Sequence, residues 1–156
     1  MWSRRGLLAA FAALPVLAAC GFAPVYGVAP EVRGSLAFEA PESVMGFRVI
    51  ERLEDRLGAP EGARATLRVA LSTMRSAAAI DAEGDLVRYS LNGEARWSIT
   101  GPEGVEASGR ETAFTGYSTT GSTVATAAAE ADAEERLAVI LADMIVAQVL
   151  MQAAAR

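Results

Sequence analysis

The sequence predicts an α+β domain with two helices packed on one face of a roughly four-stranded sheet, in the order β-α-β-β-β-α. Two observations lead to this prediction. Residues 64–72 and 86–117 alternate apolar and polar side chains with a period of two, as strands with one buried face do. Residues 44–57 and the alanine-rich stretch from residue 123 instead repeat apolar side chains at helical spacing.

The length of the chain allows one domain. Of its 156 residues, the first nineteen resemble a removable export signal, which leaves 156 − 19, or 137, for the mature protein. A chain of that length buries enough surface for one hydrophobic core without a metal or disulfides. We therefore expect a single core, and the sequence contains no internal repeat.

The first strand and the first helix are predicted close together. Residues 35–40 form a short strand that Pro41 ends. Ser43 suits the N-cap position of a helix over residues 44–57, and Gly58 stops that helix. Its predicted apolar side comprises Phe47, Ile50, Leu53 or Glu54, and Leu57. Its predicted solvent side comprises Arg48, Glu51, Arg52, Asp55 and Arg56.

Three further strands follow. The first begins with the regular alternation of residues 64–72 and continues, less regularly, to Ile80, and residues 81–85 form a turn. The next strand has the cleanest alternation in the chain, with a predicted buried face of Val87, Tyr89, Leu91, Ala95, Trp97 and Ile99. A turn at residues 101–104 leads into the last strand, over residues 105–117. Its alternation slips at Glu111, which predicts a β-bulge there.

A long alanine-rich helix ends the chain. The polar break over residues 119–122 offers several side chains that can cap it. Its predicted apolar stripe comprises Leu137, Ile140, Leu141, Met144, Ala147 and Met151. Acidic side chains concentrate in its N-terminal half, where the helix dipole favours them.

The composition excludes most catalytic classes. The chain contains no histidine and one cysteine, so it cannot assemble a Ser-His-Asp triad, a Cys-His dyad or a histidine or multi-cysteine zinc site. A pI near 4.8 and a net charge of −5 argue against a nucleic-acid binder. The acidic residues over 81–85 lack the ligand spacing of a calcium loop, and the carboxylates of the last helix lack the aromatic cleft of a glycosidase. We predict a non-enzyme without a metal or a cofactor.

The N-terminus predicts an export signal that ends at a lipidation site. A cationic segment with Arg4 and Arg5 precedes an apolar run, and residues 17–20 (Leu-Ala-Ala-Cys) resemble the bacterial lipobox, in which small residues precede an acylated cysteine. The expected organisation is a removed signal over residues 1–19, a lipidated Cys20, a tether over residues 20–34 and a single domain over residues 35–156. An ordinary signal peptide is the alternative, and the Sec and twin-arginine export routes both stay open.

Three motifs resemble the LptE family of lipopolysaccharide-assembly lipoproteins, in its alphaproteobacterial form. They are residues 20–27 (CGFAPVYG), residues 85–91 (DLVRYSL) and the segment over residues 127–145. The resemblance implies a non-catalytic lipoprotein on the periplasmic face of the outer membrane, which plugs the β-barrel protein LptD, helps it assemble and takes part in inserting lipopolysaccharide into the outer leaflet. The alternative is another lipid-anchored periplasmic adaptor, or an accessory subunit of an envelope transporter.

Within that resemblance, arginines of the predicted strands are candidates for contact with the lipopolysaccharide headgroup, because guanidinium forks suit phosphates and carboxylates. The preferred candidates are Arg75 and Arg88, near the ends of successive strands, and the further candidates are Arg68 and Arg96. The alternative is a solvated sheet face on which such arginines pair with Glu94 and Glu106.

Overall fold

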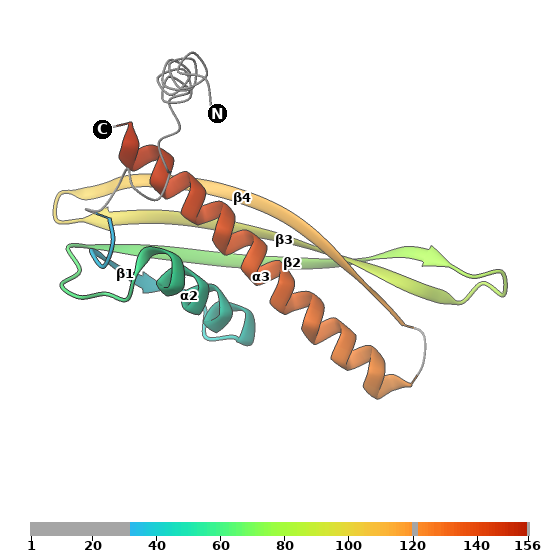
Figure 1. Ribbon diagram of the computed structural model, residues 1–156. Coiled ribbons are helices and arrows are strands. Elements are labelled where there is room, and N and C mark those ends of the chain that lie inside the picture. The colour runs from blue at the N-terminus through green and yellow to red at the C-terminus, as the bar shows by residue number, and fades with distance from the viewer. Residues whose placement is uncertain (1–31, 120–121, 156) are drawn as a thin grey trace, which may run out of the picture.

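A computed structural model describes residues 32–119 and 122–155 of the chain (Figure 1). Its elements are β1 (Leu36–Glu39), α2 (Val44–Leu57), β2 (Ala65–Ile80), β3 (Leu86–Gly101), β4 (Gly104–Ser118) and α3 (Thr123–Ala154). Both helices lie on one face of a four-stranded sheet. The predicted α+β fold and its element order are confirmed. Cys20, the predicted signal and most of the predicted tether lie outside the described residues.

The sheet is mixed and has the strand order β1-β2-β3-β4. β1 pairs parallel to β2 over four residues, and α2 supplies the crossover that a parallel pair requires. β2, β3 and β4 pair antiparallel in two long hairpins. Within the described part of the chain, β2 beyond Arg68 therefore has a neighbour on one side only, and β4 is an edge strand. The far end of β2 and β3 extends past α3 as an arm, residues 78–88 (Figure 1). We call it the hairpin arm.

α2 has the predicted ends but a different phase. The Ser43 hydroxyl accepts a hydrogen bond from the Gly46 backbone N–H at 3.0 Å, and Gly58 ends the helix with a φ of +88°. Phe47 is 62% exposed, so the predicted apolar side is wrong there. The buried residues are Met45, Gly46, Val49, Leu53 and Leu57. A Cβ on Gly46 would lie 2.0 Å from the Pro41 carbonyl oxygen, so this close approach turns Phe47 outward.

α3 is apolar on two sides over its C-terminal half. By length and composition it is the one described helix that could cross a membrane, but 44% of its most apolar window is buried inside the protein. Its buried residues are Ala133, Leu137, Ala138, Leu141, Ala142, Ile145, Val146, Val149 and Leu150. The predicted stripe is correct for Leu137 and Leu141. It is wrong for Ile140 and Met151, which are 40% and 53% exposed, and for the exposed Ala147, because the alanines of the opposite side let that side lie closer to the sheet.

The sheet face under the helices carries the core. The predicted buried face of β3 is confirmed for Leu91, Ala95, Trp97 and Ile99, none of which exceeds 8% exposure. Trp97 lies opposite Gly109 of β4, where a Cβ would come within 2.7 Å of the indole ring. The glycine thus leaves room for the largest side chain of the core.

The β-bulge predicted at Glu111 is absent. The pairing of β3 with β4 is continuous past Ala95 and Glu111, and the register shift falls instead between Ile99 and Thr100. Glu111 interrupts the alternation because it is a buried polar residue of the core face, 8% exposed. Trp97 Nε1–H donates a hydrogen bond to Glu111 Oε1 at 3.4 Å, which gives the buried carboxyl a partner.

Asp143 of α3 joins the two helices. Arg52 of α2 donates from Nε and Nη2 to the two carboxylate oxygens at 3.0 and 2.9 Å, and Arg56 Nε lies 3.3 Å from Oδ1. One turn earlier, Arg48 Nη2 lies 3.3 Å from Glu135 of α3. The predicted solvent side of α2 is therefore wrong for these arginines, which face α3.

Candidate functional site

Four elements bring side chains together beneath the first half of α3. Arg75 of β2 extends its guanidinium over the Tyr89 ring of β3, with Cζ 4.9 Å from the ring centroid. Its Nη1 donates to Glu130 Oε1 of α3 at 3.0 Å and to the Tyr117 hydroxyl of β4 at 3.4 Å. Tyr89 and Tyr117 stack with their centroids 5.4 Å apart. We call these four residues the distal cluster.

The distal cluster holds a charged arginine at a half-exposed position. The hydrogen bond to Tyr117 and the nearby Glu130 carboxylate raise the pKa of Arg75, so its guanidinium stays charged. Burial raises the pKa of Tyr117, so its hydroxyl keeps its proton at neutral pH. The Arg75 side chain remains 52% exposed, which leaves part of the guanidinium facing solvent. An anion can therefore reach Arg75 without opening the core.

The opposite face of the sheet, which no described helix covers, carries two predicted arginines that are already paired. Arg68 Nη2 lies 2.7 Å from a Glu39 carboxylate oxygen of β1. Arg96 Nε lies 2.7 Å from Glu94 on its own strand, and Glu94 also accepts a hydrogen bond from Arg110. That hydrogen bond is the main cause that lowers the pKa of Glu94. The predicted alternative of pairing with Glu94 is thus confirmed for Arg96.

Arg88 lies on the same uncovered face, in the hairpin arm. Its side chain is exposed and forms no ion pair with any residue that the structure describes. Arg75 faces the helices, whereas Arg88 and the two paired arginines face away from them. The structure therefore does not bring the four predicted arginines into one site.

The acidic turn next to Arg88 has a structural explanation. Asp81 Oδ1 accepts hydrogen bonds from the backbone N–H groups of Glu83 and Asp85 at 3.1 and 2.8 Å, which closes the turn. Within residues 32–119 and 122–155, no group of His, Cys, Asp or Glu is arranged to hold a metal ion.

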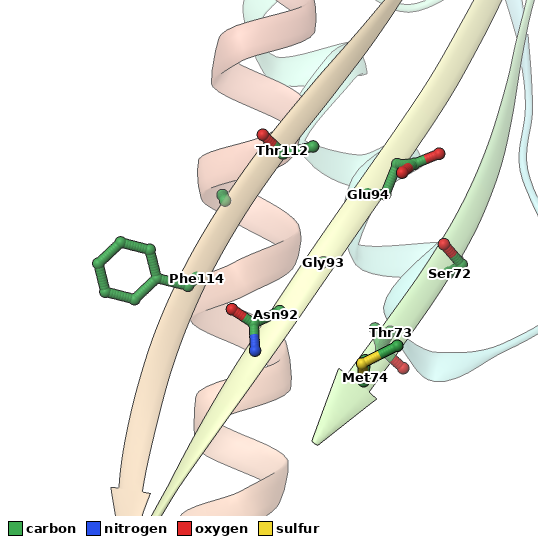
Figure 2. A pocket seen from close by; sticks show the side chains of 9 residues that line it. Ser72, Thr73, Met74, Asn92, Gly93, Glu94, Thr112 and Phe114 are labelled. Atoms are coloured by element: carbon green, nitrogen blue, oxygen red, sulfur yellow. The ribbon is translucent and has the colours of Figure 1, made fainter. Parts of the chain in front are cut away.

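The uncovered face also has a shallow hollow that the sequence analysis missed. Its volume is about 410 Å³, and it opens over β2, β3 and β4 (Figure 2). Met74 and Phe114, 71% and 73% exposed, lie in one cross-strand row with Asn92 between them. Met74 and Phe114 occupy positions at which their strands otherwise carry polar side chains. This departure from the alternation is the sequence feature that could have indicated the hollow.

The fold presents surfaces of the kind that binding and scaffolding proteins use. Among the described residues these are a sheet face that no helix covers, paired surface charges and a half-exposed arginine. The chain belongs to the LptE family of lipopolysaccharide-assembly proteins, which it matches over residues 35–149. Members of this family are non-enzymatic lipoproteins, so the prediction of a non-enzyme is confirmed by the family.

Solved structures of bacterial lipoproteins share the fold. A Caulobacter crescentus protein described as a lipoprotein is 20% identical, with a TM-score of 0.68 over 85% of this chain and 99% of that one. Rare lipoprotein B from Shewanella oneidensis is 16% identical, with a TM-score of 0.57 over 73% and 92% of the two chains. A minor lipoprotein from Acinetobacter baumannii is 19% identical, with a TM-score of 0.52 over 74% and 91%. A search of curated proteins finds no match.

Proposed function

We propose that the protein is an outer-membrane lipoprotein of the alphaproteobacterial LptE type, anchored through an acylated Cys20, that plugs the LptD β-barrel and helps it assemble for lipopolysaccharide insertion. Family membership over most of the chain supports the assembly role, and the lipobox at residues 17–20 supports the anchor. The likeness in fold to the Caulobacter crescentus protein agrees with the alphaproteobacterial type.

The uncovered sheet face is the observation that carries the plug proposal. Its residues are mainly small hydroxyl side chains and paired charges, and they include Thr66, Arg68, Ser72, Ser90, Glu94, Arg96, Ser98, Thr100, Ser108, Arg110 and Thr112. The lumen of an outer-membrane barrel is polar and filled with water. A broad face of this chemistry fits such a lumen, because its polar groups need no covering apolar surface.

Arg75 and Arg88 are the residues that we propose for contact with lipopolysaccharide. Arg88 is exposed and forms no ion pair with a described residue, so its guanidinium is not already neutralised by a bound carboxylate. Arg75 is charged and half exposed, and a phosphate can take the place of Glu130 beside it. Arg68 and Arg96 are the weaker candidates, because Glu39 and Glu94 already neutralise them.

The first test is purification of the affinity-tagged protein from detergent-solubilised outer membranes. We expect a one-to-one complex with LptD, together with loss of surface lipopolysaccharide when the protein is depleted. Recovery of the protein alone, or with an inner-membrane transporter, and a normal outer leaflet after depletion would contradict the proposal. Those results would favour the alternative of another lipid-anchored adaptor.

The anchor and the arginines need separate tests. Cys20→Ala should give an unacylated chain whose mass lacks the lipid and which, in cells depleted of LptD, leaves the membrane in a high-salt wash. Arg88→Gln should weaken binding of lipopolysaccharide to the purified protein several-fold, because a charge-assisted contact is lost. Arg68→Gln is the matched control from the same face and should change binding little. Equal effects of the two substitutions would contradict the assignment of Arg88.

A further inference from the structure

The outward side of the C-terminal part of α3 is an apolar stripe without a partner among the described residues. It consists of Ile140, Met144, Ala147 and Met151, which follow one another at helical spacing. Ile140 and Met151 are 40% and 53% exposed, Ala147 is exposed and Met144 is half buried. The sequence over residues 144–155 contains no charged residue. A surface helix normally presents polar side chains on this side, so the stripe can bury apolar area against a partner surface.

The apolar stripe lies at the end of the domain where the described chain begins. Val32 packs against the core, and the Gly34 backbone N–H donates to the Leu57 carbonyl oxygen at the end of α2. α3 ends at this same end of the sheet (Figure 1). Cys20 precedes Val32 by 32 − 20, or 12, residues, which span at most about 40 Å when fully extended. An acyl anchor on Cys20 therefore keeps this end of the domain within about 40 Å of a phospholipid surface.

Two arginines at this end can contact phospholipid headgroups. Arg33 and Arg64 are both exposed, and neither forms an ion pair with a residue in the described ranges. The Arg64 backbone N–H donates to the Ser35 carbonyl oxygen, which places both arginines beside the start of β1. The C-terminal part of α3 carries no acidic side chain, whereas Glu61 and Glu103 are exposed at this end of the sheet. This end thus combines the apolar stripe with two arginines that have no acidic partner among the described residues, as interfacial protein segments combine apolar and basic side chains.

We propose that the apolar stripe and the arginine pair Arg33 and Arg64 rest on the phospholipid leaflet that carries the acyl anchor, so that the membrane holds the domain at a second place. This inference rests on the proposed lipid anchor. A second copy of the chain is a poorer occupant, because four side chains cover far less than the roughly 800 Å² per partner of a stable interface. A polar barrel lumen is also a poor match for an apolar stripe. The hairpin arm lies at the opposite end of the sheet and would then point away from the leaflet (Figure 1).

The test of the apolar stripe uses the acylated protein in vesicles of phosphatidylethanolamine and phosphatidylglycerol. Cys20 is the only cysteine, and acylation consumes its thiol, so Met151→Cys provides a single site for a polarity-sensitive fluorophore. Val124→Cys is the matched control, because Val124 is 77% exposed at the other end of α3. We expect a blue shift and several-fold quenching by nitroxide-labelled lipids at position 151, and neither effect at position 124. Equal signals at the two positions would overturn the proposal.

The other occupants give different signals with the same labelled protein. A shift at position 151 that grows with protein concentration in the absence of vesicles would indicate a second copy, and would overturn the proposal. A shift that occurs only after LptD is added would indicate the barrel, with the same consequence.

The arginine pair is tested without the anchor, so that this result stands whether or not Cys20 is acylated. The Cys20→Ser chain should sediment with vesicles that contain phosphatidylglycerol, and Arg33→Gln with Arg64→Gln should reduce the bound fraction several-fold. Arg136→Gln, on the N-terminal half of α3, where the guanidinium pairs with Asp132, should leave it unchanged. Lack of binding, or an equal loss with Arg136→Gln, would overturn the membrane contact. The mass of the wild-type protein reports acylation independently, so failure of the anchor is distinguishable from failure of the contact.

Discussion

Gly93 lies on the core face of β3 where α3 crosses the sheet, and its replacement would measure how closely the two approach. An added Cβ would lie 2.8 Å from Leu137 Cδ2 and 3.1 Å from Leu141 Cδ1. Both leucines have no exposed surface, so neither side chain can move into solvent to relieve the contact. The helix or the strand must shift instead.

The expected cost follows from two opposing effects. Overpacking a filled core costs roughly 1–3 kcal/mol, and the smaller freedom of alanine in the unfolded chain returns roughly 0.4–1 kcal/mol. We therefore expect Gly93→Ala to lower the free energy of unfolding by about 1–2 kcal/mol, or the Tm by about 4–8 °C for a domain of this size. Gly93→Val should cost more, about 2–4 kcal/mol, although valine is the better strand residue.

Urea unfolding followed by circular dichroism measures both variants. Asn92→Val on the uncovered face is the control, because it adds a strand-forming side chain to the same strand away from α3. Leu137→Ala should reduce the cost of Gly93→Ala by at least about 0.5 kcal/mol, since it empties the space that the new Cβ needs. A Gly93→Val variant as stable as the wild type would refute the reasoning and place α3 farther from the sheet.

Three further predictions test the packing and the charges. Leu141→Asp should lower the free energy of unfolding by several kcal/mol because Leu141 is fully buried, whereas Ile140→Asp should be tolerated. A lower thermal midpoint for Ile140→Asp than for Leu141→Asp would contradict the orientation of α3. Asp143→Asn should cost about 1–2 kcal/mol in urea unfolding at this position about one-third exposed, because the uncharged amide can accept only one of the two hydrogen bonds from Arg52. The pKa of Glu94 is lowered from its ordinary value of 4.5 in the folded protein. Its ion pairs therefore stabilise the fold above pH 4.5, and this stabilisation is lost as the pH falls through the lowered pKa. Glu94→Gln should therefore reduce the loss of Tm between about pH 7 and about pH 3.

The strands were predictable because each has one apolar and one polar face. A shift of one residue would bury Arg96 and expose Trp97, so the alternation in β3 admits a single arrangement. The apparent slip at Glu111 shows the limit of this argument. A buried glutamate and a bulge interrupt the pattern in the same way, and the indole N–H of Trp97 that distinguishes them lies on another strand.

The phase of each helix could not be predicted as well. α3 has apolar side chains on two sides over its C-terminal half, so hydropathy alone does not say whether Ile140 or Ile145 faces the sheet. Backbone approach decides this, and it favours small side chains such as Ala138, which contribute little to a hydropathy pattern. In α2 the bulky Phe47 dominates the hydropathy pattern, although its side chain is exposed. The adjacent Gly46 is the buried residue, and it approaches the Pro41 carbonyl closely.

The distal cluster illustrates what the sequence leaves undetermined about the site. The sequence places Arg75 near the end of a strand, but its partner Glu130 is 130 − 75, or 55, residues away on another element. The same holds for Arg68 and Glu39, which meet only because β1 pairs parallel to β2. Whether an arginine is available to a ligand depends on such long-range pairing, which is why Arg88 and Arg68 differ although both lie on polar strand faces.

The shortness of β1 has a consequence for handling the isolated protein. Along β2 beyond Arg68 and along the outer edge of β4, backbone N–H and C=O groups of the described chain face outward without a paired strand. Such edges are templates for strands of other molecules, and natural proteins protect them by cover or charge. At high concentration and without a binding partner, the protein should therefore associate edge to edge into oligomers rich in β-structure. Its solubility would then report whether a partner occupies those edges.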